Sequence, residues 1–207
     1  METHLTKTTN AGYTDAELRS IVPGYEFFHK ERSTRKGGGV GIFVTEKLSR
    51  NVKIIDQLTV SEELFENLTI QISNCISTGK SNYQKDLSVA AIYRPPNSQS
   101  YDLFNSELEK LLTSIDKSKS EVVLTGDLNL DLLKYENHLP TANYLDLVIN
   151  HKLLPRIVRP TRIKKQSATL IDHIFTKDDK IHLVSGIIDT ELAGNSGYTD
   201  HLQYLPF

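Results

Sequence analysis

A carboxylate and an amide two residues apart follow a short apolar run in the second half of the chain. The run is Val122–Leu124, it ends at Gly126, and Asp127 and Asn129 come next. Side chains at positions i and i+2 of an extended chain point the same way, so we expect this pair to project together from the end of a buried strand. The carboxylate accepts and the amide both donates and accepts, which suits a phosphate oxygen and an attacking water. The alternative is an ordinary turn, because Asp and Asn are common turn formers.

A second carboxylate interrupts a later apolar stretch, ATLIDHIF at residues 168–175. Asp172 and His173 lie in its middle and, on a strand, point to opposite faces. Burying a carboxylate without a partner is costly, so Asp172 requires a histidine, an arginine or a metal ion nearby. A structural salt bridge is the alternative interpretation of Asp172.

Asp200 and His201 form an adjacent acid–imidazole pair before the last apolar run. Such a pair at the start of a strand can supply a metal carboxylate and an imidazole. The imidazole can act as an acid, a base or a hydrogen-bond donor to a phosphate, depending on its pKa. We expect Asp172 to orient His201, as a carboxylate holds a catalytic base.

Three other polar residues stand at places where chemistry is possible. Tyr93 and Arg94 close an apolar strand and are followed by two prolines that fix its exit. A tyrosine hydroxyl there can donate to a phosphate, although tyrosines at strand ends mostly pack. Glu2 follows Met1, and by position alone it is an exposed surface group.

Basic side chains are concentrated in two stretches although the net charge is −2. The basic run, residues 156–165 (RIVRPTRIKK), carries five basic side chains and no acid. The second stretch is KERSTRK at 30–36, which runs into three glycines. Each alone is equally well explained as a solvated loop. Together with the polar motifs they favour a surface that contacts a phosphate backbone.

The elements that must position these residues are mostly strands. Apolar, β-branched runs predict strands at residues 40–45, 52–56, 66–73, 87–93, 121–126, 170–175, 181–188 and 202–207. Helical spacing of apolar residues predicts one helix from Tyr101 with Ser100 as its N-cap, and another over 141–151 with Thr141 as its cap. Many strands clustered towards both ends, with few helices, predict a sandwich of sheets with helices outside.

Composition narrows the class of protein. With 207 residues, 38% hydrophobic and 24% charged, the chain is typical of one soluble globular domain. The single cysteine, Cys75, excludes an intrachain disulfide and a cysteine-rich zinc site. We find neither a signal peptide nor a run long enough to span a membrane, so no membrane partner is expected.

The motifs, taken in order, resemble the endonuclease/exonuclease/phosphatase superfamily, and most closely the apurinic-type endonuclease domain of non-LTR (LINE-like) retrotransposons. The likeness runs over nearly the whole chain. It rests on the segments ETHLT, GGGVGIFV, YRPPN, GDLNLDLL, RPTRIKKQSATLIDHIF and TDHLQYLPF. One such motif is weak, but their common order is specific.

The resemblance implies an α/β fold, a four-layer sandwich of two mainly antiparallel or mixed β-sheets flanked by helices. It also implies Mg²⁺-dependent nicking of DNA, with Mn²⁺ as a substitute, in an intracellular and nuclear setting beside a reverse transcriptase domain of the parent element. Glu2 and Asp200 would bind the metal. The implied catalytic residues are Tyr93, Asp127, Asn129, Asp172 and His201. The implied substrate-binding residues are Arg94, Arg159, Thr161, Arg162 and Lys164.

The sequence departs from the family pattern at three places. The family's first strand, which carries an asparagine of the site, precedes the segment that matches ETHLT, and only Met1 precedes Glu2 here. His4 replaces the usual tryptophan, and Thr199 stands where serine is usual. We therefore expect a single domain over 1–207 that lacks its first strand, with impaired activity. The alternatives are an inactive transposon-derived remnant that at most binds nucleic acid, and a phosphatase or phosphodiesterase acting on small molecules or lipid headgroups.

Overall fold

The computed structural model describes most of the chain from Val22 to Lys177 and two short strand segments near the C-terminus. The described residues are 22–30, 39–55, 64–77, 84–96, 100–164, 166–177, 186–187 and 203–204. Glu2, Asp200, His201 and the basic stretch from residue 31 to 36 lie outside these ranges, so the predictions made for them stay predictions.

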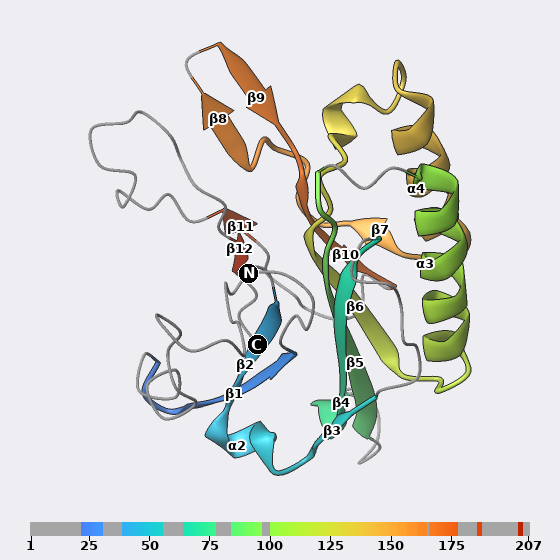
Figure 1. Cartoon of the computed structure of the whole chain (residues 1–207). Coiled ribbons are helices and arrows are strands. Elements are labelled where there is room, and N and C mark those ends of the chain that lie inside the picture. The colour runs from blue at the N-terminus through green and yellow to red at the C-terminus, as the bar shows by residue number, and fades with distance from the viewer. Residues whose placement is uncertain are drawn as a thin grey trace, which may run out of the picture.

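A six-stranded mixed sheet forms the centre of the molecule, in the order β3-β4-β5-β6-β10-β7 (Figure 1). Its neighbours are antiparallel except β5 and β6, which are parallel. Parallel neighbours need a crossover, and helix α3 supplies it between β5 and β6. The strands are β3 (Val52–Ile54), β4 (Glu66–Ser77), β5 (Gln84–Tyr93), β6 (Glu121–Asp127), β7 (Leu154–Pro155) and β10 (Asp172–Thr176).

Helix α3 (Tyr101–Asp116) confirms the helical spacing seen in the sequence. Ser100 is its N-cap, and the serine side chain accepts a hydrogen bond from the backbone N–H of Leu103 at 3.2 Å. The predicted apolar stripe is the buried face of the helix. Its members are Phe104, Leu108, Leu111, Leu112 and Ile115. This stripe packs on one face of the sheet and so fixes the crossover.

Helix α4 (Leu139–Asn150) begins two residues earlier than predicted. His138 is its N-cap, and Pro140 lies in its first turn, where a missing N–H removes no intrahelical bond. Thr141 is therefore not the cap. It is buried inside the helix, and its hydroxyl lies 2.8 Å from Nδ1 of His138.

The remaining strands form two-stranded sheets. β1 (Tyr25–Lys30) pairs with β2 (Val40–Thr45), and the short helix α2 (Glu46–Ser49) follows. β8 (Arg162–Lys164) pairs with β9 (Ser167–Thr169), and β11 (Gly186–Ile187) pairs with β12 (Gln203–Tyr204). All three pairs are antiparallel.

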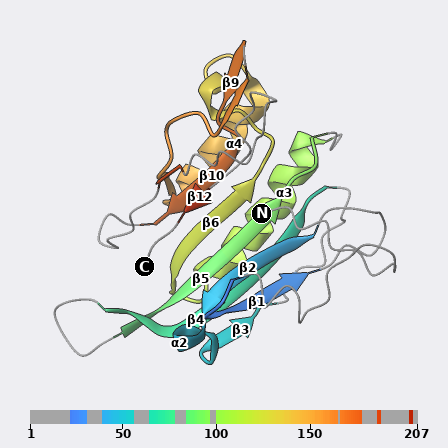
Figure 2. The same ribbon diagram turned by 90° about the vertical axis from the view of Figure 1, so that its left-hand side faces the viewer.

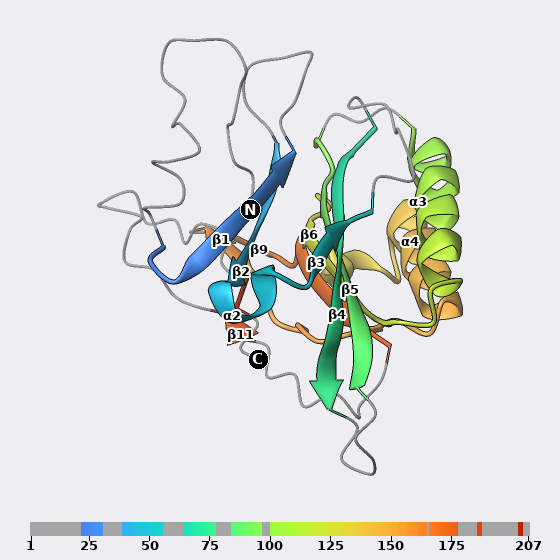
Figure 3. The ribbon, with the colours of Figure 1, turned by 90° about the horizontal axis from the view of Figure 1, so that it is seen from below.

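The layers follow from which face of the six-stranded sheet each element covers. Helices α3 and α4 cover one face, and β1 and β2 lie on the other, as Figures 1 and 3 agree. Figure 2, seen from the side of β1 and β2, shows this pair in front of β4 and β5. Val40 and Val44 of β2 belong to the same apolar core as the inward residues of β4 and β5. The fold is thus the predicted mixed α/β sandwich of two packed sheets, and in the described part of the chain its two long helices, α3 and α4, cover the six-stranded sheet.

The strands that the sequence did not predict are polar or very short. The sequence of β1, YEFFHK, mixes aromatic and charged residues and contains no β-branched run. β8 and β9 have three residues each, and backbone pairing alone defines them. Apolar periodicity reports burial, so it misses strands with little contact to the core. Among the residues that the structure describes, no helix has the length and apolar character needed to cross a membrane.

Candidate functional site

The end of β6 is shaped by one glycine and one left-handed residue. Gly126 has φ +142°, and a Cβ added there would lie 1.8 Å from the carbonyl oxygen of Ile92. Only glycine lets β6 approach β5 so closely. Asn129 has φ +48°, in the left-handed region that asparagine tolerates. The chain therefore leaves the strand at a sharply defined point.

Asp127 and Asn129 are brought together by a turn and not by an extended chain, so the sequence argument from strand alternation was wrong in its geometry. Oδ1 of Asp127 accepts a hydrogen bond from the backbone N–H of Asn129 at 3.0 Å. The Asn129 amide nitrogen donates to the carbonyl oxygen of Arg94 at 2.8 Å. This contact fixes the orientation of the Asn129 amide against the end of β5.

Asp172 lies directly across from Asp127. The two residues are register partners in the antiparallel pair of β10 and β6. Side chains directly opposite in such a pair lie on the same face, with Cβ atoms about 4.5–5.5 Å apart. Asp172 is buried at 4% exposure, and Asp127 is half-buried. Two carboxylates so close together favour cations and hydrogen-bond donors in their surroundings.

The same row of residues continues across two more strands. Ala91 of β5 is the register partner of Thr125 of β6, so two residues further along Tyr93 lies beside Asp127. Glu66 of β4 is the register partner of Tyr93. Because partners share a face, the site row (Glu66, Tyr93, Asp127 and Asp172) crosses four adjacent strands at one end of the sheet.

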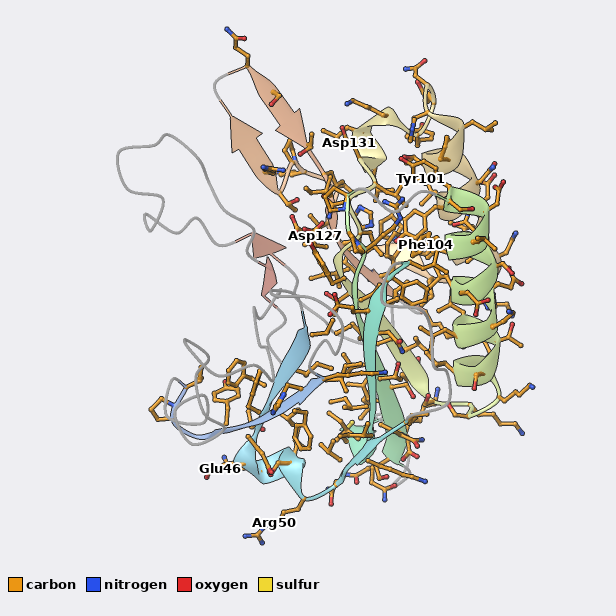
Figure 4. All side chains as sticks on the ribbon, in the orientation of Figure 1. Glu46, Arg50, Tyr101, Phe104, Asp127 and Asp131 are labelled. Atoms are coloured by element: carbon orange, nitrogen blue, oxygen red, sulfur yellow. The ribbon has the colours of Figure 1, made fainter. Side chains whose placement is uncertain are left out.

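The site row faces the second sheet and not the helices. The Glu66 carboxylate accepts a hydrogen bond at 2.5 Å from the backbone N–H of Gly39, the residue that precedes β2. On the other face, the residues next in sequence to the row contact the helices: Arg94 contacts α3, and His173 contacts α4. In Figure 4, Asp127 is at the upper end of the central sheet, below Asp131, and Tyr101 and Phe104 lie on the side of α3.

Arg94 was predicted to bind substrate, and the structure places its guanidinium elsewhere. The side chain is fully buried, with its Cζ 4.6 Å from the ring centroid of Tyr101 and 5.3 Å from that of Phe104. Burial lowers the pKa of Arg94, and Tyr101 acts in the opposite direction. A guanidinium enclosed between two aromatic rings cannot reach a substrate without rearrangement. Its backbone, however, donates to the Asp127 carbonyl at 2.9 Å and accepts from Asn129.

Thr161 was also predicted to bind substrate, but it is buried at 3% exposure. Its hydroxyl oxygen accepts from the backbone N–H groups of Ile171 at 3.3 Å and Asp172 at 3.2 Å. Thr161 therefore holds the start of β10 in place. It does not form part of an exposed surface.

The basic run is partly a projecting hairpin and not a plain loop. Arg159 is exposed, Arg162 is half-buried in β8, and Lys164 ends that strand. Figure 1 shows β8 and β9 standing out from the end of the six-stranded sheet. Arg156, at the start of the run, instead donates from Nε to the Thr176 hydroxyl in β10. The outer part of the run is thus presented to solvent near the site row.

The donors in this region fit a magnesium ion that has few protein ligands. Within the described part of the chain, no group of three or more His, Cys, Asp and Glu side chains could hold a metal ion. The row and Asn129 nevertheless supply carboxylate and amide oxygens, which are the ligands that Mg²⁺ prefers. Mg²⁺ commonly uses only one or two protein carboxylates and keeps several waters.

Sequence reasoning missed three residues that organise the site. Glu66 begins a predicted strand, and an acid at the start of an apolar run was its only signal. Asp131 accepts from the backbone N–H of Leu170 at 2.9 Å and of Leu133 at 3.2 Å. His173 was noted only as facing away from Asp172. Its contacts with distant residues have no signature in the local sequence.

Comparison with known proteins places this fold in a family. The model of the Endonuclease/Exonuclease/phosphatase family matches residues 2–201. No curated protein sequence gives a significant match. An AP endonuclease from Archaeoglobus fulgidus is similar in structure, with a TM-score of 0.62 and 18% identity over 96% of this chain and 84% of that chain.

Two further structures resemble the chain to a comparable degree. The 3′ phosphatase NExo from Neisseria, bound to a product DNA hairpin, has a TM-score of 0.60 and 13% identity over 92% of this chain and 81% of that chain. The endonuclease domain of TRAS1, a telomere-specific non-LTR retrotransposon, has a TM-score of 0.58 and 12% identity over 86% of this chain and 76% of that chain. These likenesses agree in fold, and the family model spans almost the whole sequence. The chain belongs to the endonuclease/exonuclease/phosphatase family.

Proposed function

We propose that this chain is a Mg²⁺-dependent DNA-nicking endonuclease of the non-LTR retrotransposon type. The observation that carries the proposal is the direct register pairing of Asp127 with Asp172, beside an Asn129 amide whose orientation is fixed by the Arg94 carbonyl. Two carboxylates and an oriented amide at one end of a sheet suit a phosphodiester and an attacking water.

Each residue then has a distinct task in phosphodiester hydrolysis. Asp127 takes a proton from the attacking water or holds it in line, and Asn129 donates to the phosphate or positions that water. Tyr93 contacts the phosphate from the neighbouring strand. Asp172 orients His201, whose imidazole donates to the phosphate as negative charge develops there.

A divalent cation completes this assignment. Glu2 and Asp200 would hold Mg²⁺, or Mn²⁺ in its place, and the ion would stabilise the negative charge that develops on the phosphate. The oxygen donors of the described part of the site are of the right chemical type for such an ion.

Two of the residues predicted to bind substrate receive a different task. Arg94, enclosed by Tyr101 and Phe104, anchors the backbone that holds the Asn129 amide. Thr161 holds the backbone that carries Asp172. Both position catalytic groups without contacting the substrate themselves.

DNA is the substrate that the outer surface favours. The hairpin of β8 and β9 projects near the site row, and exposed Arg159 and half-buried Arg162 give it positive charge in a chain that is acidic overall. Val158 and Ile163 on the same segment are 71% and 51% exposed, so it also offers apolar contacts. A charged projection of this kind suits a nucleic-acid backbone better than a small phosphate ester. The NExo structure contains DNA, and the TRAS1 domain comes from a non-LTR retrotransposon.

The origin and setting of the protein follow from this proposal. A nicking domain of this type works beside a reverse transcriptase domain in the parent element. Its target is chromosomal DNA, so its place of action is the nucleus.

Nicking of supercoiled plasmid DNA tests the proposal. The 207-residue chain should convert plasmid slowly to open circles with Mg²⁺, in keeping with the impaired activity expected from its sequence, and become inactive in EDTA. Asp127→Asn should reduce the rate by about 100-fold or more. Asp146→Asn, which changes an exposed carboxylate of α4, is the matched control and should nick like the parent.

Other outcomes would point to other functions. DNA binding without nicking would favour an inactive nucleic-acid-binding protein. Hydrolysis of small phosphate esters without action on DNA would favour a phosphatase of the same family.

A further inference from the structure

His173 lies directly after Asp172 in β10, with its imidazole on the helix-facing side of the sheet. The side chain is 1% exposed. Its Nδ1 is 3.0 Å from the hydroxyl of Tyr144 on α4. Its Nε2 is 3.0 Å from the carbonyl oxygen of Leu130 and 3.1 Å from that of Leu170. One buried ring therefore contacts three separate segments of the chain.

The partners of the ring determine its tautomer. Two carbonyl oxygens can only accept, so Nε2 carries the proton and donates to both. Nδ1 then accepts from the Tyr144 hydroxyl, whose pKa is raised by complete burial, so the hydroxyl stays protonated. Burial lowers the pKa of His173 to about 4, so the ring is neutral under ordinary conditions.

The two carbonyls belong to segments that carry the candidate catalytic residues. We call residues 127–132 the Asp127 loop and residues 170–172 the Asp172 segment. Their backbones are joined by hydrogen bonds from Leu128 N–H to the Ile171 carbonyl and from Leu132 N–H to the Leu170 carbonyl, each 2.9 Å. The His173 Nε2–H adds one hydrogen bond to each segment from the helix-facing side of the sheet, where the ring is buried from solvent.

We propose that His173 is a positioning residue of the site: its Nε2–H bonds the Asp127 loop to the Asp172 segment and so keeps the two carboxylates in register on the opposite face of the sheet. This inference rests on the proposed function of those carboxylates. His173 touches neither the substrate nor the reacting atoms. It acts through the carbonyls of Leu130 and Leu170, the second of which also accepts from the Leu132 N–H.

Two amide substitutions separate this role from mere filling of the core. In His173→Gln, the amide nitrogen lies about as far along the side chain as Nε2 and can still donate to the two carbonyls. In His173→Asn, the shorter amide reaches only the place of Nδ1, beside Tyr144. Both variants are polar and uncharged, so the difference between them isolates the Nε2 contact. Tyr144→Phe removes the other contact and is the matched control.

Steady-state nicking with Mg²⁺ is the first measurement. His173→Asn should lower kcat by roughly 10- to 100-fold with little change in KM for DNA, because small misplacements of catalytic groups are costly. His173→Gln and Tyr144→Phe should stay within about three-fold of the parent chain. His173→Phe, which keeps a flat aromatic ring of somewhat larger size and removes both polar contacts, replaces the asparagine variant if that variant does not fold. A folded Asn or Phe variant with the kcat of the Gln variant would overturn the proposal.

Amide hydrogen exchange is the second measurement, and it does not depend on activity. The N–H groups of Leu128 and Leu132 should exchange about 10-fold faster or more in His173→Asn than in His173→Gln, while the amides of β4 should not differ. Equal exchange in the two variants would overturn the positioning role whatever the nicking result. If the parent chain does not nick DNA and the exchange rates differ as expected, the proposed function fails and the positioning of the two segments stands.

Discussion

Acid should destabilise this fold through His173, and the size of the effect follows from its burial. The ordinary pKa of histidine is 6.5, and burial lowers that of His173 to about 4. The unfolded chain therefore binds a proton more readily than the folded one over this interval. The stabilising effect of the neutral ring is complete above the unfolded pKa of 6.5 and is lost as the pH falls towards 4.

The magnitude is set by the width of that interval. At about 1.4 kcal/mol per pH unit, the loss reaches about 2 kcal/mol by about pH 5 and about 3 kcal/mol near pH 4. A domain of this kind has about 5–15 kcal/mol of stability in all, so one residue removes a large share of it.

Urea unfolding followed by circular dichroism at several pH values measures this loss. Other groups also titrate, so the useful quantity is the difference in free energy of unfolding between the parent chain and His173→Gln, which cannot be protonated there. Between about pH 7 and pH 5, the parent chain should lose about 2 kcal/mol of free energy of unfolding relative to His173→Gln. Tyr144→Phe, which keeps the imidazole buried, should follow the parent chain. A difference that does not change with pH would show that His173 is not buried in the neutral form, and the reasoning would fail.

Three further predictions concern the binding surface and the backbone. Replacing three side chains of the basic run by alanine should flatten the dependence of DNA affinity on salt by about one unit of log–log slope for each phosphate group that the variant no longer neutralises. Arg50→Ala, at the opposite end of the molecule (Figure 4), should leave the salt dependence unchanged. The residues to replace together are Arg159, Arg162 and Lys164. Gly126→Ala should cost about 3 kcal/mol or more in urea unfolding because its Cβ would overlap the Ile92 carbonyl. Gly24→Ala, with φ +84° and nothing within 4 Å of the added Cβ, should cost only about 1 kcal/mol. Ser100→Ala should destabilise α3 by about 1 kcal/mol, and a wild-type unfolding midpoint would contradict the capping role.

Local patterns in the sequence were sufficient to predict the elements that bury a continuous apolar surface. The helical stripe of α3 and its Ser100 cap were predicted correctly because spacing and capping act within a few residues. Asp172 was singled out because an acid inside an apolar strand is costly. The structure places it opposite Asp127, as a shared site requires.

The features that could not be predicted depend on contacts between distant residues. His173 meets the Leu130 carbonyl 43 positions away and Tyr144 29 positions away. Arg94 was expected to bind substrate because the family resemblance implied it, whereas the packing of α3 encloses its side chain. The sequence left both a turn and an extended chain open at Asn129, and the turn shows only in the left-handed backbone of Asn129 and its N–H bond to Oδ1 of Asp127.

The position of β10 in the sheet bears on how the protein folds. This strand lies between β6 and β7, although β7 precedes it in the chain. β7 can pair with the sheet only after β10 has docked, and Asp172 is the first residue of β10. Contacts between segments far apart in sequence close slowly, because loop entropy opposes them. The two candidate carboxylates therefore meet late in folding, so a nascent chain should bring them together only after β10 has been synthesised.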